Sequence, residues 1–191
     1  MSELDEYLIT TRQFEEFRKI PRLSRECIVT EKIDGTNGQI YIEDDGLGLY
    51  VGSKSRWLSA KEDNHGFYAW AMKNLDELLK LGPGRHYGEF WGSGIQRGYG
   101  LQKNDKRFSL FNTSRWNTDN VPACCGVVPV LFTGLFDTSI IEATLMLLKA
   151  SGSRAAPGFM NPEGVVIFHT ALNGYFKKTI EKDDEWKGKQ Q

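Results

Sequence analysis

The pattern of apolar and polar positions predicts strands in the first quarter of the chain. Residues 27–33 read as a β-strand, and in residues 38–43 Ile40 and Ile42 alternate with more polar neighbours. Such alternation is typical of a strand, whose successive side chains point to opposite faces. The sequence Asp-Asp-Gly then marks a turn, and residues 47–51 return as the second strand of a hairpin.

Apolar residues at helical spacing predict two substantial helices and a shorter one. The longest run, residues 64–81, ends at a Gly-Pro-Gly sequence. A second helix is predicted over residues 140–150, opened by a capping box that pairs Ser139 with Glu142. Residues 10–20 form the pattern of a short amphipathic helix that stops before a proline.

The rest of the pattern consists of short strands. They are predicted at residues 85–91, 107–111, 127–132, 164–170 and 174–180. Mostly antiparallel strands with two substantial helices predict an α+β fold.

Composition narrows the class of protein. The chain has 191 residues, of which 40% are hydrophobic and 26% charged, and these values fit one globular domain. A net charge of −1 excludes polyanion binding by bulk positive charge. No apolar run approaches the ~18–20 residues of a membrane span, and the acidic N-terminus has no signal-peptide pattern. The three cysteines suit neither a disulfide framework nor a zinc site, so we expect a cytoplasmic, intracellular protein.

The sharpest chemical signal is the sequence Glu-Lys-Ile-Asp-Gly-Thr-Asn at residues 31–37. Lys32 has apolar neighbours in the sequence, and a desolvated lysine amine is a usable nucleophile. Asp34, Gly35 and Asn37 suit a tight turn that brings backbone close to a ligand. An ordinary hairpin turn with a surface lysine explains this segment alone equally well.

The segment resembles motif I of the covalent nucleotidyltransferases, which are the ATP-dependent RNA and DNA ligases and the mRNA capping enzymes. Sequences that look like the other motifs follow in the family's order: Gly-Ser-Lys-Ser-Arg at 52–56, Tyr-Gly-Glu-Phe-Trp-Gly at 87–92, Arg-Phe-Ser-Leu-Phe-Asn at 107–112, Pro-Glu-Gly-Val-Val-Ile at 162–167 and Tyr-Phe-Lys-Lys at 175–178. The Gly-Thr-Asn ending of motif I and the Gly-Ser-Gly-Ile-Gln tract at 92–96 are most similar to RNA ligases.

This resemblance implies a fold and a reaction. The fold is a nucleotidyltransferase domain (an ATP-grasp-like ligase adenylation domain) of mostly antiparallel sheets with flanking helices. In the reaction, a lysine takes AMP from ATP, passes it to the 5′-phosphate of RNA, and a 3′-hydroxyl displaces the AMP. Such chemistry serves RNA repair, and it needs mainly positioning and charge neutralisation from the protein.

The resemblance also implies roles for single residues. Lys32 is the nucleophile, and the backbone of Glu31 contacts the adenine edge. Asn37 and Arg56 hold the sugar and phosphates, because a guanidinium donates two parallel hydrogen bonds. A surface ion pair is the alternative for Arg56.

The base and ribose have their own expected contacts. Glu89 contacts the ribose. Phe111 stacks on adenine, with Phe108 as the alternative and core packing expected for whichever does not stack. Val166 closes the opposite face of the base.

Glu163 is the expected metal ligand, since Mg²⁺ (or Mn²⁺) takes few carboxylates together with waters and substrate phosphates. An acid at a strand start is the alternative for Glu163. Motif V departs from the family, which has two lysines separated by one residue, whereas Lys177 and Lys178 are adjacent. Neighbouring strand residues face opposite ways, so we assign the catalytic role to Lys177. Lys178 stays a nucleotide-binding candidate that could instead contact polynucleotide or solvent.

The chain ends soon after motif V, which predicts a single adenylyltransferase domain over residues 1–191 without a C-terminal OB-fold or accessory domain. An accessory protein or RNA-binding partner could then replace the missing domain. Three alternatives to an RNA ligase stay open: a DNA nick-sealing ligase, a guanylyltransferase that uses GTP, and a nucleotide- or RNA-binding module without turnover.

Overall fold

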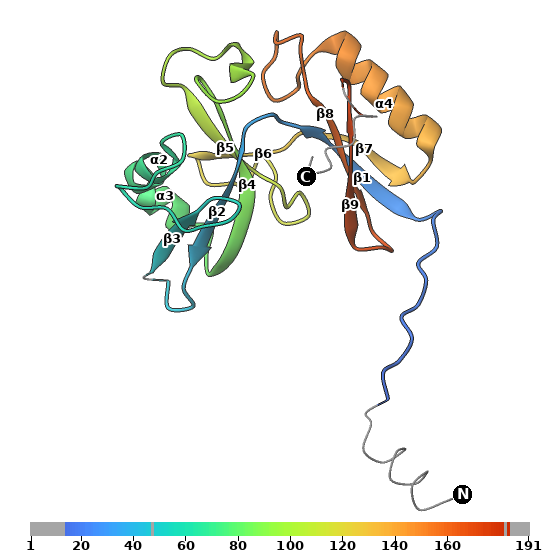
Figure 1. Ribbon diagram of the computed structural model, residues 1–191, viewed down its shortest axis with the longest axis horizontal. Coiled ribbons are helices and arrows are strands. Elements are labelled where there is room, and N and C mark those ends of the chain that lie inside the picture. The colour runs from blue at the N-terminus through green and yellow to red at the C-terminus, as the bar shows by residue number, and fades with distance from the viewer. Residues whose placement is uncertain (1–13, 47, 182, 184–191) are drawn as a thin grey trace, which may run out of the picture.

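Two β-sheets face each other in the computed structural model, which describes residues 14–46, 48–181 and 183 (Figure 1). The first sheet has the strand order β7-β1-β8-β9, and the second has the order β3-β2-β4-β5-β6. Neighbouring strands are antiparallel except for the pair β5 and β6. The α+β architecture expected from the sequence is confirmed. The helices in the described part of the chain are too short or too polar to span a bilayer.

The first sheet packs one face against a long helix. Its strands are β1 (Glu26–Lys32), β7 (Val130–Leu135), β8 (Gly164–His169) and β9 (Gly174–Thr179), and the helix is α4 (Thr138–Ser151). Along β1, Cys27 and Val29 are fully buried in a core with Ile141 and Leu145 of α4. Because strand side chains alternate, Lys32 lies on the opposite face, which is turned toward the second sheet.

The second sheet carries the larger core. Its strands are β2 (Thr36–Ile42), β3 (Leu49–Gly52), β4 (Gly84–Gly92), β5 (Lys106–Leu110) and β6 (Cys125–Val127). Short helices α2 (Phe67–Lys73) and α3 (Leu75–Leu79) cover it, and a 3-10 turn, η1 (Gly98–Gly100), follows β4. Phe67, Phe90 and Phe108 pack against one another with ring centroids 4.7 and 5.0 Å from Phe67.

The chain changes sheet twice, and the two crossings meet. It leaves the first sheet after β1, builds the whole second sheet, and returns at residues 128–129 between β6 and β7. The Glu31 N–H donates to the Pro129 carbonyl at 2.9 Å, which ties the return to the end of β1. The strand predicted over residues 127–132 is therefore two strands in different sheets. Proline cannot donate a ladder hydrogen bond, so it suits the break.

Two helix predictions need correction. The helix expected over residues 64–81 is interrupted at Asn74, whose side chain donates to the Trp70 carbonyl at 2.8 Å and competes with the helical bonding. The second helix begins earlier than its predicted capping box, because Asp137 is the N-cap and accepts from the Ser139 N–H. Aspartate is as good an N-cap as serine.

The prediction of a short N-terminal helix is wrong for the residues that the structure describes. Residues 14–20 are not helical, and Phe14, Phe17 and Ile20 are exposed. A helix this short needs tertiary packing to be stable. The first residues of that prediction, 10–13, lie outside the described part of the chain, as do residue 47 of the predicted hairpin and most of the C-terminal tail.

Candidate functional site

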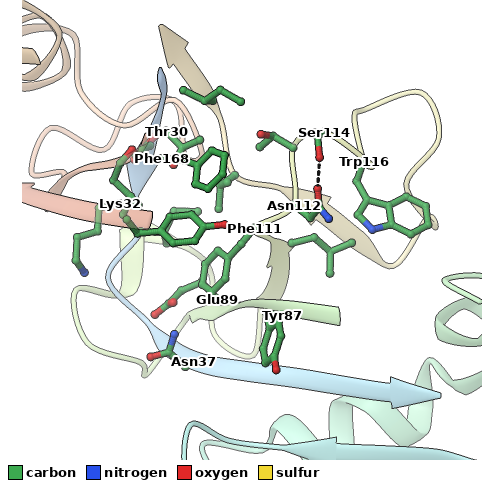
Figure 2. A pocket seen from close by; sticks show the side chains of 18 of the residues that line it. Thr30, Lys32, Asn37, Tyr87, Glu89, Phe111, Asn112, Ser114, Trp116 and Phe168 are labelled. Atoms are coloured by element: carbon green, nitrogen blue, oxygen red, sulfur yellow. Dashed lines mark hydrogen bonds between the residues drawn. The ribbon is translucent and has the colours of Figure 1, made fainter. Parts of the chain in front are cut away.

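A cavity of about 870 Å³ opens between the two sheets (Figure 2). Lys32, Asn37 and Glu89 lie at one end of it, and Asn112, Ser114 and Trp116 at the other. The predicted site residues in its lining are Glu31, Lys32, Asp34, Gly35, Asn37, Glu89, Phe111, Val166 and Lys177. Residues from motifs far apart in the chain thus meet at one cavity.

Lys32 is the last residue of β1, immediately before the chain crosses between the sheets. Its Nζ forms an ion pair with Oε2 of Glu163 at 2.6 Å, and the two side chains are 24% and 18% exposed. Glu163 directly precedes β8, whose first residue pairs with Lys32. The antiparallel register therefore brings the two charges together across 131 residues of sequence.

Glu89 forms the opposite wall of this end of the cavity. It lies on β4 opposite Asn37 of β2, and its Oε1 accepts from the Gly35 N–H at 3.1 Å. Burial raises the pKa of Glu89 to about 7, against the opposing effects of the Lys32 charge and the Gly35 hydrogen bond. A carboxylic acid with its pKa near neutrality beside a lysine is typical of a functional site.

This raised pKa predicts a pH-dependent cost to folding. The folded protein holds a proton on Glu89 that the unfolded chain releases near pH 4.5, so stability falls as the pH rises from about 4.5 to above 7. Glu89→Gln removes the charge and keeps an acceptor for Gly35. We expect the variant to be more stable than the parent at pH 8 by on the order of 3 kcal/mol, with little difference near pH 4.5.

Urea unfolding of both proteins at the two pH values measures this difference. Glu62→Gln, at an exposed glutamate, is the control and should differ from the parent by less than about 0.5 kcal/mol at either pH. Equal stability of Glu89→Gln and the parent at pH 8 would mean that Glu89 ionises normally.

The two phenylalanines considered for stacking on adenine lie in different environments. Phe111 lines the cavity, whereas Phe108 is fully buried in the core of the second sheet. Val166 lines the cavity from β8, and Phe168, two residues further along the same strand, also projects into it (Figure 2). Phe168 packs on Tyr175 with centroids 4.9 Å apart, so the cavity has aromatic side chains that motif comparison did not single out.

The two adjacent lysines of β9 point in opposite directions. Lys177 pairs with Val166 in the sheet and lines the cavity. Lys178 forms ion pairs with Glu142 of α4 at 3.0 Å and with Asp183 at 3.2 Å, and these carboxylates raise its pKa. Lys178 is therefore held at the helix-covered face of the sheet and does not line the cavity.

Arg56 is placed away from the expected nucleotide contact, whereas the position of Glu31 leaves its expected backbone contact open. Arg56 does not line the cavity, and its half-exposed side chain lies 3.5 Å from Glu62. The carboxylate of Glu31 is buried on the α4 side of the sheet, where Ser153 donates at 2.5 Å and the backbone N–H groups of Arg154 and Ala155 donate at 2.7 and 2.9 Å. The side chain of Glu31 thus anchors a loop, and its backbone faces the cavity.

Sequence reasoning did not predict that two residues hold the turn after Lys32. Arg97 donates from Nε to Oδ2 of Asp34 at 3.0 Å, and the Tyr99 hydroxyl accepts from the Asp34 N–H at 2.8 Å. Both residues come from the glycine-rich segment after β4. The density of glycine at 92, 94, 98 and 100 was the available signal, because it indicates a backbone built into an unusual shape.

The RNA ligase family model matches residues 25–179 of this chain. No curated protein is similar enough in sequence to count as a match. Among solved structures, a mutant of Naegleria gruberi RNA ligase with ATP and Mn is 20% identical with a TM-score of 0.62, over 83% of this chain and 51% of that one. A mutant of the same ligase with AMP and Mn is 18% identical with a TM-score of 0.59, over 82% and 50%. This chain therefore spans about half the length of those structures.

Proposed function

This chain belongs to the RNA ligase family, and on that premise we propose that it joins RNA ends in an ATP-dependent reaction through a lysyl-AMP intermediate on Lys32. The neutral amine of Lys32 attacks the α-phosphate, a nitrogen–phosphorus bond forms, and pyrophosphate leaves. The AMP then passes to the 5′-phosphate of an RNA end. A 3′-hydroxyl attacks that activated phosphate, forms the phosphodiester and releases AMP.

One observation carries the proposal: a lysine at the junction of two sheets lies in the wall of a nucleotide-sized cavity and pairs with an acid. The cavity volume of about 870 Å³ falls within the range of small-molecule sites. Glu163 balances the charge of Lys32 before ATP enters. The lysine must leave this ion pair and lose a proton before it can attack.

The lining suggests how a nucleotide is held. Phe111, which directly follows β5 of the second sheet, and Val166, in β8 of the first sheet, could cover the two faces of adenine. Asn37 and Glu89, which are directly opposite across β2 and β4 and line the cavity, would contact the ribose. Lys177 is the cation of motif V that can reach the α-phosphate from the cavity wall.

The residues present fit a divalent cation, Mg²⁺ or Mn²⁺, that arrives with ATP. Among the residues that the structure describes, no group of three or more His, Cys, Asp or Glu side chains could hold a metal ion. Mg²⁺ needs no such cage, because it takes one or two carboxylates with waters and substrate phosphates. Glu163 supplies such a carboxylate next to Lys32. The bound cation would supply charge neutralisation on the phosphates.

Transfer of label from α-labelled ATP to the protein tests the first step. We expect label that survives denaturation and alkali and is released by acid, as a nitrogen–phosphorus bond requires, in the presence of Mg²⁺, and more label from ATP than from equal GTP. A panel of nicked RNA, DNA and hybrid duplexes, each with a 5′-phosphate, then tests the substrate. Sealing of RNA supports the proposal, sealing of DNA alone contradicts it, and label without sealing of any duplex in the panel would restrict the activity to adenylylation.

The orientation of the two lysines of β9 makes a separate prediction. Lys177→Ala should slow label transfer by at least about 10-fold, because it removes the cation that faces the α-phosphate. Lys178→Ala should retain most of the rate, since its side chain is paired with Glu142 and Asp183. Single-turnover rates of label transfer by the two variants show which lysine acts on ATP. A slower Lys178→Ala than Lys177→Ala would mean that Lys178 turns into the cavity when ATP binds.

A further inference from the structure

We propose that residues 92–100, here called the 92–100 loop, position the nucleophile: Arg97 and Tyr99 clamp the Asp34 turn and thereby fix where Lys32 points. The inference rests on the proposed function, because the turn matters to the reaction only if Lys32 is the nucleophile. Neither Arg97 nor Tyr99 is among the residues that line the cavity. We infer that both act on the reaction through Asp34.

The guanidinium of Arg97 joins three segments of the site. Its Nε donates to Asp34 at 3.0 Å, and its Nη1 donates to the Asn161 carbonyl at 3.3 Å. Its Nη2 lies 3.7 Å from a carboxylate oxygen of Glu181. Asp34 lies just after Lys32, Asn161 lies just before Glu163, and Glu181 lies just after β9, the strand of Lys177. One side chain thus contacts the three chain segments next to Lys32, Glu163 and Lys177.

Only an arginine can make these three contacts together. Its planar fork donates in fixed directions, whereas a lysine offers a single point charge. The side chain is 21% exposed and that of Asp34 is 25% exposed, so this ion pair is partly desolvated. Without Arg97, the Asp34 carboxylate would lose its charge partner two residues from Lys32.

Tyr99 holds the backbone of the same turn. Its hydroxyl accepts from the Asp34 N–H at 2.8 Å, and its ring is 2% exposed. The ring packs on Trp91 and Phe159 at centroid distances of 5.1 and 4.7 Å, so the hydroxyl cannot move without the core. The side chain of Asp34 is thus held by Arg97 and its backbone by Tyr99.

The backbone of the 92–100 loop is strained to make these contacts. Gln96 and Tyr99 have φ values of 43° and 53°, in the left-handed region that side chains disfavour. Each such residue costs about 1–3 kcal/mol and persists where the surrounding structure demands it. At Gly92, which has φ 118°, a Cβ would lie 2.5 Å from the Asp105 carbonyl oxygen. Backbone strain of this kind clusters at functional sites.

Single-turnover label transfer across a range of ATP concentrations tests the inference with Arg97→Met and Arg97→Lys. We expect the saturated rate to fall by about 10²-fold in both, the cost of a nucleophile displaced by about 1 Å, while the ATP concentration for half-saturation changes less than 3-fold. Lys80→Met is the control, because Lys80 also forms an ion pair with an acid, Glu77, outside the cavity and outside every motif. Its rate should stay within 2-fold of the parent.

Two further measurements separate positioning from general destabilisation. Millimolar guanidinium should restore part of the rate of label transfer by Arg97→Ala. It should not change the rate of Tyr99→Phe. Arg97→Met combined with Asp34→Asn should be no slower than Arg97→Met alone, because both act through one contact. Unchanged rates, a loss only in ATP affinity, additive losses, or absence of guanidinium rescue would overturn the inference. If the parent protein itself takes no label, the proposed function fails instead.

Discussion

Lys32→Ala protein is expected to take no label from α-labelled ATP under conditions in which the parent protein is labelled. The proposed intermediate is a bond between AMP and the Lys32 amine, and alanine offers no nucleophile in its place. Lys32→Arg should fail as well, because a guanidinium stays protonated at accessible pH and cannot attack. Gel autoradiography after denaturation, together with intact mass, measures the covalent adduct.

Lys80→Ala is the control for this experiment. Lys80 forms an ion pair with Glu77 on the surface of the helical region, away from the cavity. Its loss should leave labelling at the level of the parent. Label that persists on Lys32→Ala would show that another side chain is the nucleophile and would remove the basis of the proposed site.

Glu163→Gln should slow label transfer by about 10²-fold at saturating Mg²⁺, the usual cost of losing one preorganised electrostatic group. Two effects oppose each other in this variant. The amide releases Lys32 from its 2.6 Å ion pair, which favours attack, but it no longer offers a carboxylate to a divalent cation. We expect the second effect to dominate, because the phosphates of ATP bring more charge to the site than the lysine can neutralise.

Rates measured over a series of Mg²⁺ concentrations reveal which effect dominates. The midpoint of Mg²⁺ activation should move to higher concentration in Glu163→Gln. Glu142→Gln is the matched control, since Glu142 pairs with a lysine at 3.0 Å on the other face of the same sheet. A Glu163→Gln protein with unchanged or faster transfer and the same Mg²⁺ midpoint would show that Glu163 only pairs with Lys32.

The local pattern of apolar and polar residues was sufficient to predict most of the strands. Hairpins such as β2 and β3 were predictable because alternation and a turn sequence are encoded in neighbouring residues. The prediction over residues 127–132 failed because nothing in its composition shows that the chain changes sheet at Pro129. The break at Asn74 and the cap at Asp137 were missed for a related reason, since single side-chain hydrogen bonds decide both.

The sequence by itself determined the family, the order of the motifs and the opposite facing of Lys177 and Lys178, because motif spacing and strand alternation are local properties. Tertiary structure alone decided which distant groups meet. It pairs Lys32 with Glu163, turns the Glu31 carboxylate away from the cavity, and brings Arg97 to Asp34. These contacts depend on strand register and on a loop with left-handed residues, and neither can be read from the residues that surround them in the chain.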